Sequence, residues 1–362
     1  MIHLTGPILG HVERDQAWVS GGTVLHEPPT ADSSGSISTI SGYALPGLVD
    51  LHCHVGLGAD GATDLATAEA DAIADRDTGV LLIREAGNVM DTRWVDQRAD
   101  LPRIIRAGRH IARPRRYIRG YAVELDDVAQ LPEEMARQAR AGDGWVKLVA
   151  DWLDRSMGAD AVVAPLWPAE VLKDGIAAAH ENGARVTVHA FSHASIGPLL
   201  DAGIDCIEHG TGMDADQIAE AARRGIPVTP TLRQVDNFCD FAAAAGARFP
   251  AYADQMQGMY EHRHQQVRDF AAAGVQLLPG SDAGGTLGHG TLPAELMRWQ
   301  EAGIDAADVV DFATWRARKY LGAPALGEGE PADVVVYEDD PRDDVANLTR
   351  PKAVLLHGVS VR

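Results

Sequence analysis

Residues 45–56 read LPGLVDLHCHVG, an apolar run that follows a Pro-Gly pair and ends in two histidines. Its nearly continuous Val and Leu predict a strand buried on both faces, as in a parallel sheet covered by helices. Similar runs follow along the chain, separated by longer Ala-rich, charged stretches of helical periodicity. The eight predicted strands are 47–52, 79–84, 102–107, 144–149, 184–189, 205–209, 226–231 and 274–280.

This alternation predicts an α/β chain whose parallel strands close into a (β/α)8 or TIM barrel over residues 45–322. Both ends of the chain have a different pattern. Residues 1–44 and 323–362 contain short β runs among Gly, Ser, Pro and Asp, with no helical periodicity. We expect these two ends to pair into one small composite β domain of the sandwich type.

The chain has 362 residues, with 32 Lys and Arg against 52 Asp and Glu, which gives a net charge of −20. That charge repels nucleic-acid phosphates and anionic membrane surfaces, so neither is an expected partner. No apolar run approaches the roughly 18 residues of a membrane span. Three scattered cysteines suggest a reducing compartment. We therefore expect a cytoplasmic protein that acts on a small molecule, and expect a homo-oligomer on analogy and base rates alone.

Two histidines at the end of the first predicted strand and a lysine within the fourth are candidate site residues. His52 and His54 are two positions apart, so both side chains can point to one face of a strand and hold one metal ion. Taken alone, they could equally be two polar loop residues. Lys147 lies inside the apolar run WVKLV, where an isolated ammonium would be costly to bury. A metal-bridging carbamate, a Schiff base with a carbonyl substrate, or a snorkelling salt bridge would each resolve that cost.

Three more residues follow later strands. His189 ends the fifth predicted strand, His209 ends the sixth, and Asp282 follows the eighth within GSDAGG. Each alone could be a structural residue or part of a turn. Barrel active sites lie at the carboxyl ends of the strands, and all six candidates fall at or near those ends. The placement therefore predicts one site at the barrel mouth.

Four loop residues at the same face are candidate substrate contacts. Arg233, in TPTLRQVD, could bind a substrate carboxylate through two parallel hydrogen bonds, although a surface salt bridge is an alternative. Tyr121 could offer its hydroxyl or simply pack. His193 and His289 are two further loop candidates.

Six segments together resemble the amidohydrolase superfamily in order and spacing: LPGLVDLHCHVG, WVKLV, VTVHAFS, CIEHGTGMD, GSDAGG and GEGEPADVVVYEDDP. The resemblance covers nearly the whole chain. It is closest to the branch of Xaa-Pro and Xaa-Arg dipeptidase-like enzymes, alongside imidazolonepropionase-like proteins. One departure lies at the second strand, where Glu85 follows Arg84 and many relatives carry an aspartate.

The resemblance implies a metal-dependent hydrolase that cleaves a carbon–nitrogen bond of an amide, peptide or cyclic amide. The implied ligands are His52, His54 and Asp282 for one metal ion and His189 and His209 for a second, with a carbamate on Lys147 bridging both. Zinc is the default metal for such nitrogen and oxygen ligands. A metal-activated hydroxide would attack the carbonyl, and Asp282 would carry the proton to the leaving nitrogen.

Three other functions stay open at this point. A mononuclear deaminase or imidazolonepropionase-type hydrolase would leave Lys147 and His209 in non-bridging roles. A Schiff-base lyase would use Lys147 but would leave the two histidines and Asp282 without a function. A non-catalytic scaffold of the same fold would typically have lost ligands that this chain retains.

Overall fold

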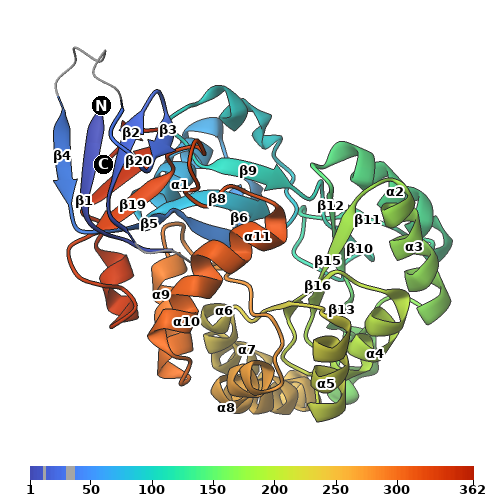
Figure 1. Ribbon diagram of the computed structural model, residues 1–362. Helices are drawn as coiled ribbons and strands as arrows, with labels where there is room; N and C mark the ends of the chain where they lie inside the picture. The colour runs from blue at the N-terminus through green and yellow to red at the C-terminus, as the bar shows by residue number, and fades with distance from the viewer. Residues whose placement is uncertain (11–13, 30–36) are drawn as a thin grey trace.

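The computed structural model describes residues 1–10, 14–29 and 37–362. Part of the Gly- and Ser-containing amino-terminal region, residues 30–36, lies outside the described residues. Figure 1 shows a strand-rich part that contains both chain termini, beside a larger part in which strands and helices alternate. The chain is therefore a mixed α/β protein, as the apolar periodicity predicts.

The strands of the larger part belong to two main sheets in which nearly all neighbours pair in parallel. One contains β6 (Leu48–Gly58), β7 (Gly61–Ala62), β8 (Val80–Glu85), β9 (Arg103–Arg106) and β18 (Ala283–Gly285). The other contains β10 (Ile111–Ala112), β11 (Val123–Glu124), β12 (Trp145–Val149), β15 (Arg185–Ala190), β16 (Cys206–His209) and β17 (Val228–Thr229). A separate hairpin joins β13 (Asp151–Leu153) to β14 (Val163–Pro165).

The predicted eighth strand is the main correction to the expected fold. Residues 274–280 form no strand; Leu277 makes one parallel bridge to Val228. Backbone hydrogen bonds nevertheless run from Leu278 N to Val228 O (2.9 Å) and from Leu51 N to Pro279 O (2.8 Å). The segment thus lies between β17 and β6 and connects the two sheets. Pro279 has no N–H to donate, which interrupts a regular ladder. Closure of all eight strands into a barrel stays a prediction.

The helices connect successive strands and are short apart from one. They are α1 (Leu65–Asp77), α2 (Leu131–Ala141), α3 (Ala169–Glu181), α4 (His193–Ala202), α5 (Ala215–Arg224), α6 (Leu232–Asp236), α7 (Phe238–Ala245), α8 (Pro250–Ala272), α9 (Leu292–Glu301), α10 (Ala306–Asp311) and α11 (Ala317–Leu321). A capping box between Asp214 and Gln217 begins α5. None of the helices in the described ranges has the length and apolar character needed to cross a bilayer.

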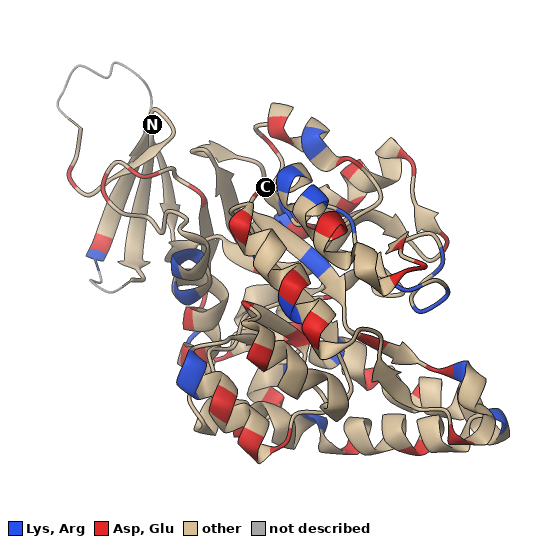
Figure 2. Cartoon of the chain, turned by 90° about the vertical axis from the view of Figure 1, so that its right-hand side faces the viewer, with Lys and Arg blue, Asp and Glu red and all other residues tan. Residues whose placement is uncertain are grey.

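Single turns complete the chain: η1 (Thr92–Gln97), η2 (Val128–Gln130), η3 (Arg155–Asp160), η4 (Gly246–Arg248), η5 (Phe312–Arg316) and η6 (Val345–Thr349). Figure 2 shows acidic and basic residues distributed over the outer helices and loops, while most of the strands carry neither. The buried core between helices and strands contains Leu48, Val146, Val188 and Ile207. The apolar runs found in the sequence therefore form the interior, as expected.

Strands from both ends of the chain form one eight-stranded sheet. Its members are β1 (Ile2–Ile8), β2 (Arg14–Ser20), β3 (Thr23–Leu25), β4 (Ser38–Ser41), β5 (Tyr43–Pro46), β19 (Val334–Tyr337), β20 (Ala353–Leu356) and β21 (Val359–Ser360). The amino-terminal β5 pairs antiparallel with the carboxyl-terminal β19, which ties the two ends together. The strands described at these two ends belong to one hydrogen-bonded sheet, and the sandwich arrangement stays a prediction. The domain boundaries at 44 and 323 stay a prediction.

Candidate metal centre and cavity

His52 and His54 both approach Asp282. Their side chains share one face of β6, and their Nε2 atoms lie 3.0 and 3.6 Å from the same Asp282 oxygen, Oδ1. Asp282 N donates to His52 O (2.7 Å), which holds the loop against the strand. Gly280 permits this approach, because a Cβ there would lie 2.6 Å from the Cβ of His52. The three side chains therefore converge as the sequence predicts.

Lys147 is completely buried in the centre of β12, where its ammonium contacts the carboxylate of Glu208. Glu208 also accepts a hydrogen bond from Thr187 Oγ1 (2.6 Å) and lies 3.6 Å from the Arg84 guanidinium. Burial lowers the pKa of Lys147 to about 7. Sequence reasoning missed Glu208 as the partner, although a carboxylate inside the apolar run DCIEH raises the same burial problem as Lys147.

His189 and His209 form a second histidine pair beside the first. His189 Nδ1 lies 3.1 Å from His209 Nε2, and His209 Nδ1 lies 2.6 Å from the Thr231 hydroxyl. The His209 ring is 5.1 Å from the His52 ring, so the two pairs adjoin. Burial lowers the pKa of His209 to about 3 and holds that of His189 well below its ordinary value. Both rings are therefore neutral at pH 7, the form that binds metal ions.

The polar groups of this cluster are suited to hold a cation. His52 Nδ1 and His189 Nε2 are buried and have no hydrogen-bond partner in the described part of the chain. Ligand atoms of His52, His54 and Asp282 lie within 4.8 Å of one another, as do those of a second set, His52, Glu208 and His209. Unpaired buried nitrogens are costly unless an ion or water occupies them. The residues present therefore fit a bound metal ion.

The sequence suggested that all the candidate residues lie at or near strand ends. The structure places some of them inside strands instead. His52 and His54 are inside β6, because this strand continues six residues beyond position 52 to Gly58. Lys147 is the central residue of β12, whereas His209 is the last residue of β16. His209 and Asp282 have positive φ angles, of 66° and 53°, so both lie where the backbone leaves regular strand geometry.

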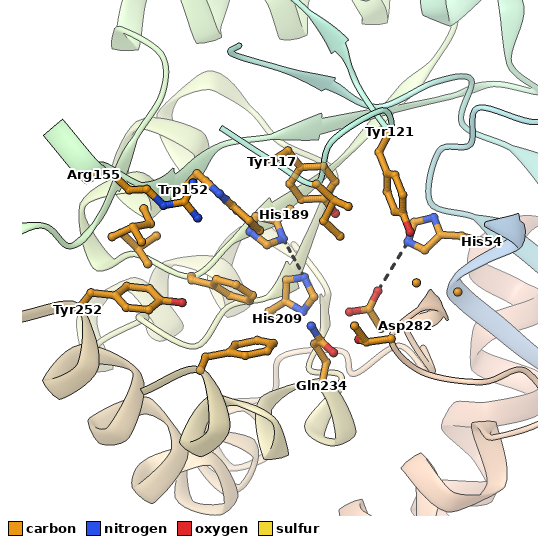
Figure 3. A pocket seen from close by; sticks show the side chains of 18 residues that line it. His54, Tyr117, Tyr121, Trp152, Arg155, His189, His209, Gln234, Tyr252 and Asp282 are labelled. Carbon is orange, nitrogen blue, oxygen red and sulfur yellow. Dashed lines mark hydrogen bonds and ion pairs between the residues drawn. The ribbon is translucent and has the colours of Figure 1, made fainter. Parts of the chain in front are cut away.

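A cavity of about 290 Å³ opens onto this cluster. Figure 3 shows His54, His189, His209 and Asp282 facing the cavity, together with aromatic side chains from several elements. The aromatic lining residues are Tyr117, Tyr121, Trp152, Phe191, Phe241 and Tyr252. A mostly apolar cavity with a few convergent polar groups is the usual form of a small-molecule site.

Only one of the four predicted substrate contacts lines this cavity. Tyr121 does, but its hydroxyl donates a hydrogen bond to Gly58 O. His193 is exposed and lies 3.6 Å from Asp214. His289 contacts Asp75 (2.8 Å) and the His54 carbonyl (3.3 Å) and does not line the cavity.

Arg233 is also absent from the cavity wall, and the reason is the register of α6. Its neighbour Gln234 points into the cavity instead, because successive residues of a helix face different directions. The Arg233 backbone N–H donates to Glu295 (2.8 Å), which fixes the start of this helix.

Glu85, whose role the sequence left open, accepts hydrogen bonds from Asn88 (2.8 Å) and Thr92 (3.2 Å).

Sequence reasoning also missed His110, which follows β9 at the same face. The residue is fully buried, and both ring nitrogens lack hydrogen-bond partners within the described ranges. Its ring stacks on that of His54 at 5.1 Å. A histidine three residues after the third predicted strand was the available indication, by an argument similar to the one that selected His189 and His209.

The sequence pattern of the amidohydrolase family matches residues 43–361. This chain belongs to the amidohydrolase family. Members of the family are hydrolases that generally use divalent metal ions. An uncharacterized protein of Mycobacterium tuberculosis is 46% identical to the chain over 358 residues, 99% of this chain and 95% of that protein. Ochratoxinase of Aspergillus niger is 25% identical over 235 residues, 63% of this chain and 48% of that enzyme.

Solved structures show the same fold. A Xaa-Pro dipeptidase with bound methionine in its active site superposes with a TM-score of 0.81 at 21% identity, over 99% of each chain. The A. niger ochratoxinase superposes with a TM-score of 0.78 at 18% identity, over 99% of this chain and 95% of that enzyme. At such identities the likeness concerns the fold, and the substrate must be argued from the site itself.

Proposed function

We propose that this amidohydrolase hydrolyses a carbon–nitrogen bond of a small amide, peptide or cyclic amide with the help of divalent metal ions. The convergence of His52 and His54 on one oxygen of Asp282 carries the proposal, because it places three ligand groups around one point. Relatives of the same fold include a Xaa-Pro dipeptidase and an ochratoxinase, which supports a substrate of this bond type.

The residues divide into two ligand sets in this proposal. His52, His54 and Asp282 would hold one ion and His189 with His209 a second, with a carbamate on Lys147 between them. Zinc suits these nitrogen and oxygen donors. A bound divalent ion would polarise the substrate carbonyl and lower the pKa of a water molecule. Burial lowers the pKa of Lys147 to about 7, which makes available the neutral amine that carbamylation requires.

Asp282 is the proton-transfer group in this proposal. Burial favours its neutral form, but His52 and His54 hold the pKa of Asp282 well below its usual range. The carboxylate is therefore ionised before reaction and can accept a proton, which it would then pass to the leaving nitrogen. Its side chain is 15% exposed and faces the cavity, so substrate can reach it.

A mononuclear hydrolase is the second candidate, and one observation favours it. The contact of the Lys147 ammonium with Glu208 neutralises the lysine without any carbamate. In that case Lys147 would be a structural cation, and the ligands of one ion would be His52, His54 and Asp282. The two candidates differ in the number of ions bound per chain and in the effect of removing Lys147.

Metal content measured by plasma mass spectrometry on protein purified without chelator separates these candidates. We expect about two divalent ions per chain, falling to one or none in Lys147→Ala, together with at least about a hundredfold loss of amide hydrolysis in that variant. Lys173→Ala, at an exposed lysine of α3, is the matched control and should change neither value.

One ion per chain that persists in Lys147→Ala would establish the mononuclear candidate. Absence of bound metal even after reconstitution with zinc and bicarbonate would refute both. Asp282→Asn tests the proton-transfer role, with hydrolysis expected to fall about 10²–10⁴-fold.

A further inference from the structure

Tyr117 presents a phenol hydroxyl without a partner to the cavity. The residue lies in the turn between β10 and β11 and contributes to the cavity wall. Its hydroxyl makes no hydrogen bond with any residue that the structure describes. The Tyr121 hydroxyl, by contrast, donates to Gly58 O, and Figure 3 shows Tyr252 at the end of the cavity opposite to Asp282. Tyr117 is therefore a free donor near the proposed metal ligands.

The Tyr117 ring borders both proposed ligand sets. Its centroid lies 5.6 Å from that of His189 in one set, and 5.4 Å from that of His110. The His110 ring in turn stacks on His54, of the other set, at 5.1 Å. Figure 3 shows Tyr117 close to His189 and facing the same cavity as Asp282. A molecule bound between the two ligand sets would therefore meet the Tyr117 hydroxyl.

Two arginines hold the turn that carries Tyr117. Arg116 donates a hydrogen bond to Leu153 O (3.0 Å), and Arg113 donates one to Leu125 O (2.7 Å). The Tyr117 ring packs against a small buried cluster formed by Ala112, Ala122 and Val149. A donor held in this way needs little reorganisation when negative charge develops on a bound molecule.

We propose that Tyr117 is a catalytic residue whose hydroxyl donates a hydrogen bond to the carbonyl oxygen of the scissile amide and stabilises the negative charge that this oxygen acquires. The inference rests on the proposed function, since it assumes that the amide is cleaved beside Asp282. Tyr117 thereby has a role separate from metal binding and from proton transfer.

Tyr117 keeps its proton through this reaction. The oxygen of water bonds to the carbonyl carbon and loses a proton to the Asp282 carboxylate, while the carbonyl π electrons move to the carbonyl oxygen. That electron pair re-forms the carbonyl when the carbon–nitrogen bond breaks, and the leaving nitrogen takes the proton from Asp282. Amide and water thus give a carboxylic acid and an amine. The hydrogen bond from Tyr117 is strongest while its acceptor is charged, so it favours the transition state over the bound amide.

Burial and the negative charge of Asp282 both raise the pKa of Tyr117, which keeps the phenol in its donor form at neutral pH. Tyr117→Phe removes this donor and keeps the ring that packs against Trp152 and His189. The folded structure and the metal centre should therefore survive the substitution, and the variant isolates the contribution of one hydroxyl.

A planar amide and its tetrahedral analogue provide the matched test pair. The amide is 4′-nitrobenzanilide, and the analogue is N-(4-nitrophenyl)-P-phenylphosphonamidate, in which phosphorus replaces the carbonyl carbon. Hydrolysis of the amide and, independently, the Kd of the phosphonamidate by calorimetry would be measured on zinc-loaded wild type and Tyr117→Phe. We expect the variant to lose about 10²–10³-fold in kcat and a similar factor in affinity for the phosphonamidate. KM should change by less than about threefold, and metal content should not change.

Tyr260→Phe, which removes a phenol oxygen of α8 outside the cavity, is the control and should change none of these values. An unchanged kcat in Tyr117→Phe, a loss that appears only in KM, or a fall in metal content would each overturn the inference. So would failure of the wild type to bind the phosphonamidate, or equal binding by wild type and variant. Tyr117-dependent binding of the phosphonamidate without hydrolysis of the amide would support Tyr117 as the donor and count against the proposed function.

Discussion

The two ends of the cavity are built in different ways. At the proposed metal end, His52, Lys147 and His189 project from the interior of parallel strands and are buried. At the far end, Arg155 comes from a single turn and Tyr252 from a helix that packs on α7. Strands fix a polar constellation precisely, whereas loops and outer helices can vary without disturbing it. We infer that the first end carries the chemistry and the second end the selectivity.

The two ends also differ in how their charges are compensated. Lys147, Glu208 and Arg84 are completely buried, and their opposite charges compensate one another. Removal of one of them leaves the remaining charges less well compensated in a low-dielectric interior. Arg155 is exposed and forms no ion pair with another described residue, so its removal should cost little stability. Three changes test this contrast.

The largest effect is expected from Glu208→Ala at the metal end. Loss of the carboxylate would leave the Lys147 ammonium and the Arg84 guanidinium buried without a counter-charge, at a cost of about 3–5 kcal/mol in the free energy of unfolding. Urea unfolding of the metal-free protein at pH 7 measures it. The partly exposed Glu220, which pairs with Arg223 and Arg224, is the control, and its replacement by Ala should have little effect.

A loss below about 1 kcal/mol for Glu208→Ala would mean that Glu208 is not needed to neutralise a buried ammonium on Lys147 or the Arg84 guanidinium. A carbamate on Lys147 would then be favoured over an ammonium. Repeating the urea unfolding with bicarbonate and zinc present would show whether the Glu208 carboxylate and the modified lysine repel each other. Either result sharpens the description of the metal end.

An intermediate, pH-dependent effect is expected from Glu295→Gln, at a buried carboxyl that lies outside the cavity lining and contacts the start of α6. Glu295 accepts backbone N–H groups from Leu232 (2.7 Å) and Arg233 (2.8 Å), and so holds the helix that presents Gln234 to the cavity. Burial raises the pKa of Glu295 from 4.5 to about 7, against the opposing effect of these N–H donors.

The sign follows from proton binding. Between about pH 4.5 and 7 the folded state holds a proton on Glu295 that the unfolded state has lost, so the free energy of unfolding falls as pH rises through this window. The Gln variant should lack this decline, which amounts to at most about 3 kcal/mol. Urea unfolding at pH 4.5 and pH 8 gives the difference, and parallel profiles for variant and wild type would contradict the assignment.

The smallest effect is expected from Trp152→Ala in the aromatic part of the cavity lining, beside His189. The indole packs against Tyr117 and the ring of His189, so its loss should raise KM about tenfold while kcat and metal content change little. Trp152→Phe should recover most of the affinity. Steady-state kinetics with an aromatic amide tests this, and a fall in kcat with unchanged KM would mean that Trp152 supports the metal end instead.

The convergence of His52, His54 and Asp282 could be predicted from the sequence, whereas their metal binding stays a prediction. His52 and His54 lie on one face of a strand because of the two-residue period, and Asp282 could be placed beside them from its position after the last predicted strand. The segment 274–280 was less accessible to prediction, because Pro279 interrupts the ladder within an otherwise strand-like run.

The partner of Lys147 was within reach of the sequence but needed a pairing that only the sheet supplies. β12 and β15 pair in register, as do β15 and β16, and this brings Lys147, Thr187 and Glu208 together across three strands. The chain separates Lys147 from Glu208 by 61 residues. No local sequence pattern could predict a contact between residues so far apart in the chain.

By itself, then, the sequence determined the α/β alternation, the apolar interior and the set of histidine and aspartate side chains directed to one face, since strand periodicity and burial are local properties. The tertiary structure alone decided that Arg155, Trp152 and Tyr252 share a cavity, while Arg233, His193 and His289 lie outside it. The directions of side chains from loops and short helices depend on how distant segments pack against one another. The hydrophobic periodicity of a single segment does not reveal that packing.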